Sequence, residues 1–239
     1  GHRKAKVSDL MTEALPLLSD GNTKGAISVL ASGLQEVAGD TTTSRDVDLV
    51  EQWETRLDKY TDMRDRPDKL MGIATGFPGL DSLTGGIRPQ QLVTFVGEAK
   101  RGKSMLTMVM AVTANIHGIS PLMVSFEMSA EEQAARHDAY LAKVSHTGLM
   151  RGMSTKAEVD RLNRELRLRK NRAPFVVVED PASSTTVSSL AAKIKQHSPG
   201  IVFVDGVYMM DDENGEPKGS PQALTNITRS LKRLAQQYK

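Results

Sequence analysis

The chain has 239 residues, 39% of them hydrophobic and 25% charged, and its net charge of +2 is too small to indicate nucleic-acid binding by itself. A chain of this length has room for one main domain and a smaller appendage, and its composition excludes a collagen-like or disordered protein. Cysteine is absent, which excludes disulfides and thiolate metal sites and fits a reducing cytoplasm, and no apolar run approaches the ~20 residues of a membrane-spanning helix.

Residues 1–66 are predicted to form a helical N-terminal region. Apolar residues recur at helical spacing in two stretches, and Gly39 is a plausible stop for the second one. A third apolar stripe predicts an amphipathic helix over about residues 47–64, ending before Pro67. This helix packs either on its own domain or on a neighbouring subunit, and the stripe alone leaves both readings open. The three stripes are Val7, Leu10, Met11, Ala14, Leu15 and Leu18; Ala26, Ile27, Leu30, Leu34 and Val37; and Leu49, Trp53, Leu57, Tyr60 and Met63.

Residues 67–239 are predicted to form an α/β domain, because short apolar β-rich runs alternate there with helical stretches. This alternation indicates a mostly parallel sheet with helices on both faces. Two of the helices have start signals, Ser129 with Glu132 and Thr155 with Glu158, and Asp211 to Pro221 is predicted to be a loop. The predicted strands are Leu92 to Val96, Leu122 to Phe126, Phe175 to Val178 and Ile201 to Val204.

The segment Gly97-Glu98-Ala99-Lys100-Arg101-Gly102-Lys103-Ser104 fits the phosphate-binding loop pattern, and it lies between a predicted strand and an apolar helix. In such a loop the backbone N–H groups and the positive end of the helix face phosphates. Lys103 is expected to reach the β- and γ-phosphates of ATP and to assist catalysis, and the Ser104 hydroxyl to bind Mg²⁺. With Met105, the next residue, these are the predicted nucleotide-binding residues. Lys100 and Arg101 either add charge beside the phosphates or are solvated loop residues.

Two acidic residues follow predicted strands. Asp205 ends the run Ile201 to Val204 and is the expected second residue of the Mg²⁺ site, although an Asp at a strand end is also a common turn residue. Glu127 follows Leu122 to Phe126, at the sheet edge where open α/β sheets gather their ligands. A carboxylate there could act as general base on the attacking water, unless it only begins the next helix.

Several segments resemble DnaB-type replicative DNA helicases, which have a RecA-like ATPase core. Thr75-Gly76-Phe77-Pro78-Gly79-Leu80-Asp81-Ser82-Leu83-Thr84-Gly85-Gly86-Ile87 is similar to the start of that core, which RadA-like and KaiC-like ATPases share. Ser125-Phe126-Glu127-Met128-Ser129, with Glu132-Gln133 and Arg136, resembles the helicase motif that carries the catalytic glutamate. Val204-Asp205 and Thr228 to Ala235 resemble the segment around the Mg²⁺-site aspartate. The resemblance spans about residues 70–239, and its later part is most similar to helicases of actinobacterial bacteriophages.

The resemblance implies an ATP- and Mg²⁺-dependent helicase that translocates on single-stranded DNA and unwinds forked duplex DNA. It implies a homo-oligomeric ring, a hexamer, with ATP between subunits, a linker helix at about Val47 to Arg64 that grips the adjacent subunit, and a primase or loader as further partner. Such a protein works in the cytoplasm, that of a bacterial host if a phage encodes it. The alternatives are a RadA-like or KaiC-like ATPase that remodels DNA or protein assemblies, and a scaffold whose nucleotide controls oligomerisation.

The sequence also departs from the family. Gly206 stands where these helicases often have Tyr after the metal-site Asp, so aromatic packing is in doubt there. The family's sensor strand, DNA-contacting loops and arginine finger have no matching segment before Lys239, so the chain is expected to be a C-terminally incomplete core. The basic residues from Arg161 to Arg172 either contact DNA phosphates or form a solvated helix face.

Overall fold

A computed structural model describes residues 2–39, 48–65, 70–180 and 184–238 of the chain, and in the first of these ranges only the side chains of residues 8–33. The chain divides into two compact units, Gly1–Arg66 and Pro67–Lys239, and each unit is described by itself. No helix among the described residues is long and apolar enough to cross a membrane.

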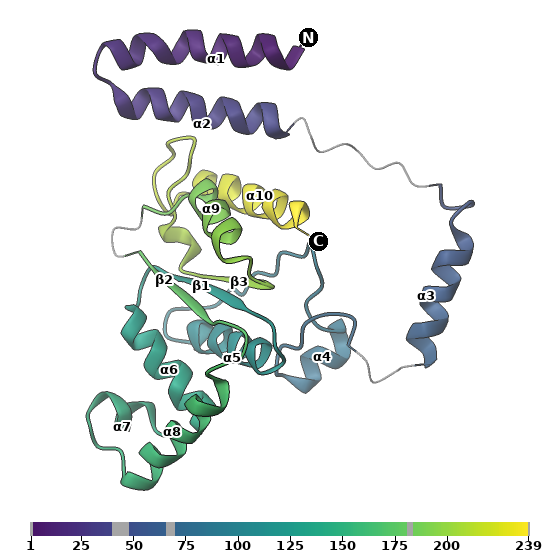
Figure 1. The fold of residues 1–239 in the computed structure, drawn as a ribbon, viewed down its shortest axis with the longest axis vertical. Helices are drawn as coiled ribbons and strands as arrows, with labels where there is room; N and C mark the ends of the chain where they lie inside the picture. Colours follow the sequence, from purple (N-terminus) through teal and green to yellow (C-terminus); the bar gives the residue numbers. More distant parts are fainter. Residues whose placement is uncertain (1, 40–47, 66–69, 181–183, 239) are drawn as a thin grey trace. The chain divides into compact units, whose positions relative to one another are not determined.

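The first unit begins with a helical hairpin. Helices α1 (His2–Ser19) and α2 (Thr23–Gly39) lie side by side, joined by a short turn (Figure 1). Ala14 and Ala26 are buried, and a Cβ atom at Gly33 would lie 1.9 Å from a methyl carbon of Leu10. Small residues therefore let the two helices approach closely. The predicted helices are confirmed here, whereas the side chains of Val7, Leu34 and Val37 lie outside the described residues.

Helix α3 (Trp53–Asp65) begins later than the sequence predicted. Asp48 Oδ1 accepts hydrogen bonds from the N–H groups of Val50 and Glu51, at 2.7 and 3.0 Å, and such a local turn competes with helix at this point. Leu49 therefore lies in a turn, and Val47 lies outside the described residues. No residue of α3 is buried among the described residues, and Trp53, Leu57 and Tyr60 of its apolar stripe are each more than half exposed.

A three-stranded parallel sheet forms the centre of the second unit, as far as the structure describes it (Figure 1). Strand β1 (Pro121–Ser125) lies between β2 (Val176–Glu179) and β3 (Ile201–Asp205), and it pairs with each of them in parallel. Three of the four predicted strands are thus confirmed to within about a residue at each end, which is the usual uncertainty of such boundaries.

The sheet is apolar on both faces, and successive residues of a strand face opposite sides. Leu122 and Val124 belong to one buried cluster, with residues of α9 (Val187–His197) and α10 (Pro221–Gln237). Met123 and Phe203 belong to a second cluster, with residues of α5 (Lys103–Ile116) and α6 (Ala130–Ala142). Helices therefore cover both faces of the sheet, as Figure 1 shows and as the sequence predicted.

The helix starts predicted from capping residues are confirmed. The Ser129 hydroxyl accepts a hydrogen bond from the Glu132 N–H at the start of α6. The Glu132 carboxylate pairs with Arg136 and does not form the reciprocal bond of a capping box. Thr155 and Glu158 form a full capping box at the start of α8 (Lys156–Arg169). The remaining short helices are α4 (Pro78–Thr84), α7 (His146–Met150) and the 3₁₀ turn η1 (Val207–Met209).

The predicted strand from Leu92 to Val96 is wrong for this structure, because no strand forms over these described residues. Val96 is 93% exposed, and Leu92 and Thr94 line a cleft of about 810 Å³ whose other wall is α10. Lys232 of α10 donates to the Gln90 carbonyl at 2.8 Å, just before this segment. A β-rich sequence becomes a strand only when a neighbouring strand supplies hydrogen bonds, and this segment pairs with no described strand.

Candidate nucleotide site

The phosphate loop runs directly into helix α5, which begins at Lys103. Gly102 has φ 86°, a left-handed conformation that glycine adopts at no steric cost, and it forms the N-cap of the helix. The Lys103 ammonium donates to the carbonyl oxygens of Gly97 and Glu98, both at 2.8 Å. The lysine therefore curls back over its own loop, within reach of any anion that the loop binds.

Charge within the loop is partly paired. Arg101 donates to Glu98 Oε2 through Nε and Nη2, each at 3.1 Å, and both side chains are largely exposed. Lys100 has φ 61°, a conformation that is uncommon for a residue with a side chain. The charge of Arg101 is thus offset by a carboxylate of the same loop.

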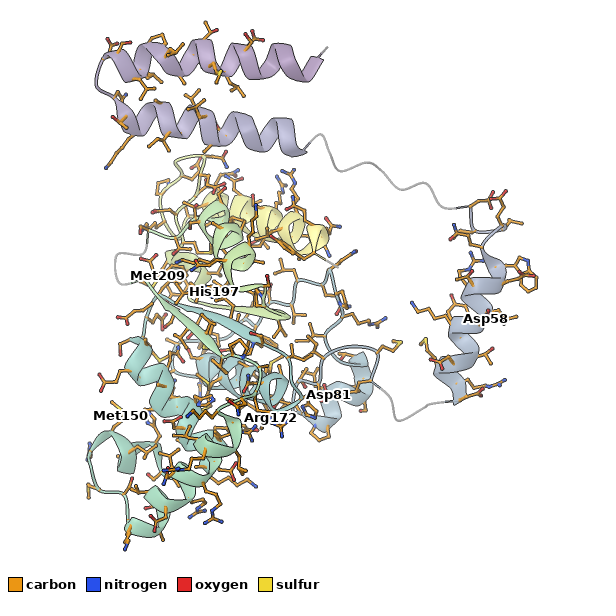
Figure 2. All side chains as sticks on the ribbon, in the orientation of Figure 1. Asp58, Asp81, Met150, Arg172, His197 and Met209 are labelled. Atoms are coloured by element: carbon orange, nitrogen blue, oxygen red, sulfur yellow. The ribbon has the colours of Figure 1, made fainter. Side chains whose placement is uncertain are left out.

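The segment that precedes the loop anchors α5. Asp81 of α4, labelled in Figure 2, is buried and accepts from the Thr75 N–H at 2.8 Å. Gly76 lies against α5, since a Cβ atom there would be 2.4 Å from the Thr113 hydroxyl oxygen. Most of the second half of α5 is buried, and this packing fixes the position of the first turn of the helix.

The two predicted acidic residues lie at the carboxyl edge of the sheet. Ser125 and Asp205 are direct partners across β1 and β3, and Phe126 N–H donates to the Asp205 carbonyl at 3.4 Å. Glu127 is exposed, one residue further along. Gly206 follows Asp205, and a Cβ atom at Gly206 would lie 3.7 Å from Glu127 Cγ. Asp205 and Glu127 therefore stand on adjacent segments.

The turn that carries Glu127 is fixed by Ser125. Its hydroxyl donates to the Met128 carbonyl at 2.7 Å and accepts from the Met128 N–H at 3.2 Å. The fully buried Gln133 adds a third hydrogen bond, from Nε2 to the same hydroxyl at 3.2 Å. Glu127 thus lies within a short bonded turn before α6 and is not part of the helix, so the reading in which it only begins that helix is not supported.

The neighbouring acidic residue after β2, Asp180, has a different environment. Burial raises the pKa of Asp180, but hydrogen bonds from Thr185 and Ser184 outweigh that effect and leave the pKa below its ordinary value of 3.8. Both the N–H and the hydroxyl of Thr185 lie 2.6 Å from Asp180 Oδ2. The Asp180 carboxylate is therefore engaged by Ser184 and Thr185, just before α9.

The environment of Asp205 differs from that of Asp180. It is 8% exposed, and its Oδ2 atom is buried without a hydrogen-bond partner among the described residues. A buried carboxylate oxygen in that state is costly unless a cation or an ordered water joins it. The Ser104 hydroxyl likewise has no partner in the part of the chain that the structure describes. Both predicted ligands thus keep an oxygen atom that no described residue engages.

The phosphate loop and the acidic residues belong to the same edge of the sheet. Helix α5 packs on β1 and β3, and residues 117–120 lead from its end into the start of β1, so the helix runs back along the sheet. Its first turn, with Lys103 and Ser104, therefore lies toward the carboxyl ends of the strands. No hydrogen bond joins the loop to Glu127 or Asp205 among the described residues.

One residue of this edge was missed by sequence reasoning. Tyr208, in η1, donates a hydrogen bond from its hydroxyl to Glu127 Oε1. The sequence offered one signal. Gly206 departs from the family pattern after Asp205, and Tyr208 follows two residues later. Spacing alone did not show that this turn would reach Glu127.

The comparisons with known proteins identify the family of the chain. Residues 72–239 match the family described as DnaB-like helicase C terminal domain. The chain is 27% identical over 175 residues to a probable replicative DNA helicase of Trieres chinensis, with 71% of this chain and 38% of that protein covered. It is 30% identical over 193 residues to the replicative DNA helicase DnaB of Treponema pallidum, with 80% of this chain and 42% of that protein covered. The chain thus spans about two fifths of the length of these relatives.

Solved structures share the fold. A structure described as an ATPase domain superimposes with a TM-score of 0.68 at 17% identity, covering 81% of this chain and 68% of that one. A structure described as a DnaB-like replicative helicase and its interactions with primase gives a TM-score of 0.65 at 17% identity, covering 98% of this chain and 55% of that one. A parallel sheet between helices, a phosphate loop and a family match over most of the chain lead to one conclusion: the chain belongs to the DnaB-like helicase C-terminal domain family.

Proposed function

We propose that this chain is the ATP-hydrolysing core of a replicative DNA helicase. The observation that carries the proposal is the position of Glu127 and Asp205 on adjacent segments at the carboxyl ends of the paired strands β1 and β3. ATP hydrolysis needs a cradle for phosphates, a Mg²⁺ ligand and a base for water, and this edge offers a candidate for each.

The proposed roles follow from these positions. Residues Gly97 to Ser104, with Met105, hold the phosphates, and Lys103 neutralises charge that develops on the terminal phosphate. Ser104 and Asp205 hold Mg²⁺, which supplies further neutralisation of phosphate charge when bound. Glu127 takes the proton from the attacking water.

The proposal extends to assembly and substrate. Hydrolysis drives translocation on single-stranded DNA and separation of forked duplex DNA by a homo-oligomeric ring, a hexamer, that works in the cytoplasm. The exposed apolar stripe of α3 supports docking on a neighbouring subunit, since such a stripe is costly to leave in water. A primase or loader is a further partner.

The basic residues of α8 have partners within the chain. Arg161 donates to the Lys143 carbonyl, Arg167 donates to Asn163, and Arg169 pairs with Glu165. Contact of this helix with DNA stays a prediction.

The test is ATP turnover of the intact protein with and without single-stranded DNA, at fixed Mg²⁺, beside the Lys103→Ala variant. A DNA-translocating motor hydrolyses ATP faster on single-stranded DNA, and the variant stays at background. An ATP turnover rate that is the same with and without DNA would overturn the motor proposal. It would favour a scaffold whose oligomerisation is controlled by nucleotide.

A further inference from the structure

Tyr208 and Glu127 meet across the carboxyl edge of the sheet. They stand 81 positions apart in the chain, on the segments that follow β3 and β1, and the Tyr208 hydroxyl donates to Glu127 Oε1. Tyr208 is 46% exposed, so the pair lies at the open edge and not in the core.

The backbone on the tyrosine side is fixed. Gly206 has φ 88°, which turns the chain sharply after β3, and Met209 N–H donates to the Gly206 carbonyl at 2.8 Å. Met210 follows and is fully buried in the cluster that also contains Val124 and Ile227. Tyr208 therefore stands on a single short turn held at both ends.

The backbone on the glutamate side shares the same core. Phe126, next to Glu127, is 6% exposed and belongs to the cluster that contains Met210. A Cβ atom at Gly206 would lie 3.5 Å from Phe126 Cβ. The two segments thus pack against each other, and the distance between Tyr208 and Glu127 is set by buried neighbours.

We propose that Tyr208 is a positioning residue for Glu127, an inference that rests on the proposed function of Glu127 as the general base. An exposed glutamate has three rotatable side-chain torsions and samples many rotamers unless a partner holds it. The Tyr208 hydroxyl engages Oε1 and leaves Oε2 for the water. A base is effective only within hydrogen-bond reach of the proton that it removes.

The reaction step balances without a change in Tyr208. As Glu127 accepts a proton from water, the water oxygen forms a bond to the γ-phosphorus, and the bond from that phosphorus to the bridging oxygen breaks. ADP departs with the electron pair of that bond. Tyr208 keeps its proton throughout, so its effect is on the orientation of the base and not on proton transfer.

The experiment replaces Tyr208 by phenylalanine in the intact protein, which removes only the hydroxyl. We expect kcat to fall about 10- to 100-fold, the scale of a misplaced catalytic group, while KM and nucleotide affinity stay within about twofold. Tyr140→Phe is the matched control, because Tyr140 is another partly exposed tyrosine, on α6, and its hydroxyl has no partner among the described residues. The melting temperature of each variant checks the fold.

A double-mutant cycle with Glu127→Gln separates positioning from a structural role. If Tyr208 acts through Glu127, Tyr208→Phe has no further effect on single-turnover hydrolysis in the Glu127→Gln background. An equal loss in both backgrounds, an unchanged kcat in the single variant, or a raised kcat would each overturn the inference. Normal turnover of Glu127→Gln itself would instead overturn the proposed role of Glu127.

Discussion

Ser125 and Asp205 are direct partners in the parallel register of β1 and β3. Because the two residues are level, the segments that follow them leave the sheet side by side, and Glu127 and Tyr208 meet there. Ser125 also fixes the turn that carries Glu127, whereas Asp205 keeps one buried carboxylate oxygen without a partner among the described residues. Ser125 thus fixes the turn that carries the proposed base, and Asp205 offers an oxygen atom to the proposed Mg²⁺. Each of the following predictions tests one part of this site.

Lys103→Ala is expected to weaken ATP binding at least about 100-fold, since it removes the cation expected to reach the β- and γ-phosphates. Titration with a fluorescent ATP analogue measures the affinity. Lys193→Ala, at an exposed position of α9, loses the same charge far from the loop and should bind normally. Wild-type affinity in Lys103→Ala would show that the loop is not the nucleotide site.

Glu127→Gln is expected to bind ATP nearly as tightly as the wild type and to hydrolyse it at least ~100-fold more slowly, the scale of a lost general base. Glutamine keeps the size of the side chain and can still accept from Tyr208, so the fold should not change. Steady-state turnover and nucleotide titration on the same preparation separate the two effects. Unchanged turnover would remove Glu127 from the mechanism.

Asp205→Asn is expected to separate stability from function. Neutralising a buried carboxylate with an unpartnered oxygen should leave the free energy of unfolding without nucleotide unchanged, or raise it by up to about 1 kcal/mol. The Mg²⁺ concentration needed for half-maximal turnover should rise at least about tenfold, because the amide is a poorer Mg²⁺ ligand. Urea unfolding and Mg²⁺ titration measure the two quantities. A large loss of stability with normal Mg²⁺ dependence would make Asp205 a structural residue.

Asp180→Asn is expected to lower stability in a pH-dependent way. Because the pKa of Asp180 is lowered in the folded protein, its charged form stabilises the fold above its ordinary pKa of 3.8, and that contribution is lost as the pH falls through the lowered value. At pH 7 the variant should be less stable by about 1.5–3 kcal/mol, the scale of a hydrogen bond to a charged group. Urea unfolding should show this difference shrinking below the ordinary pKa. A difference that persists there would point to packing instead.

Leu57→Asp is expected to impair assembly of the ring, because it places a charge in the exposed apolar stripe of α3. Thr55→Asp introduces the same charge two residues earlier, off the stripe, and serves as the control. Mass photometry with ATP and Mg²⁺ gives the oligomer distribution. Equal assembly of both variants would show that the stripe packs elsewhere.

The order of elements and most of the site were predictable because they follow local rules. Strands β1, β2 and β3 are apolar runs, the capping residues at Ser129 and Thr155 act within one turn, and the loop before Lys103 has fixed spacing. The conformation of the segment from Leu92 to Val96 was not predictable, because a strand forms only beside a neighbouring strand, which the local sequence does not reveal. The predicted start of α3 was wrong because a local turn forms at Asp48. The contact of Tyr208 with Glu127 could not be predicted, because it depends on the packing of Gly206 against Phe126.

The most direct test of the central claim is strand separation on a forked DNA duplex by the intact protein. We expect unwinding that requires ATP and Mg²⁺, stops in Lys103→Ala and Glu127→Gln, and persists in Lys193→Ala. Release of a fluorescently labelled strand, followed over time against a blunt duplex of the same sequence, measures it. Unwinding that continues in Lys103→Ala, or intact protein that hydrolyses ATP on single-stranded DNA yet never separates the fork, would contradict the account of this chain as the motor of a replicative helicase.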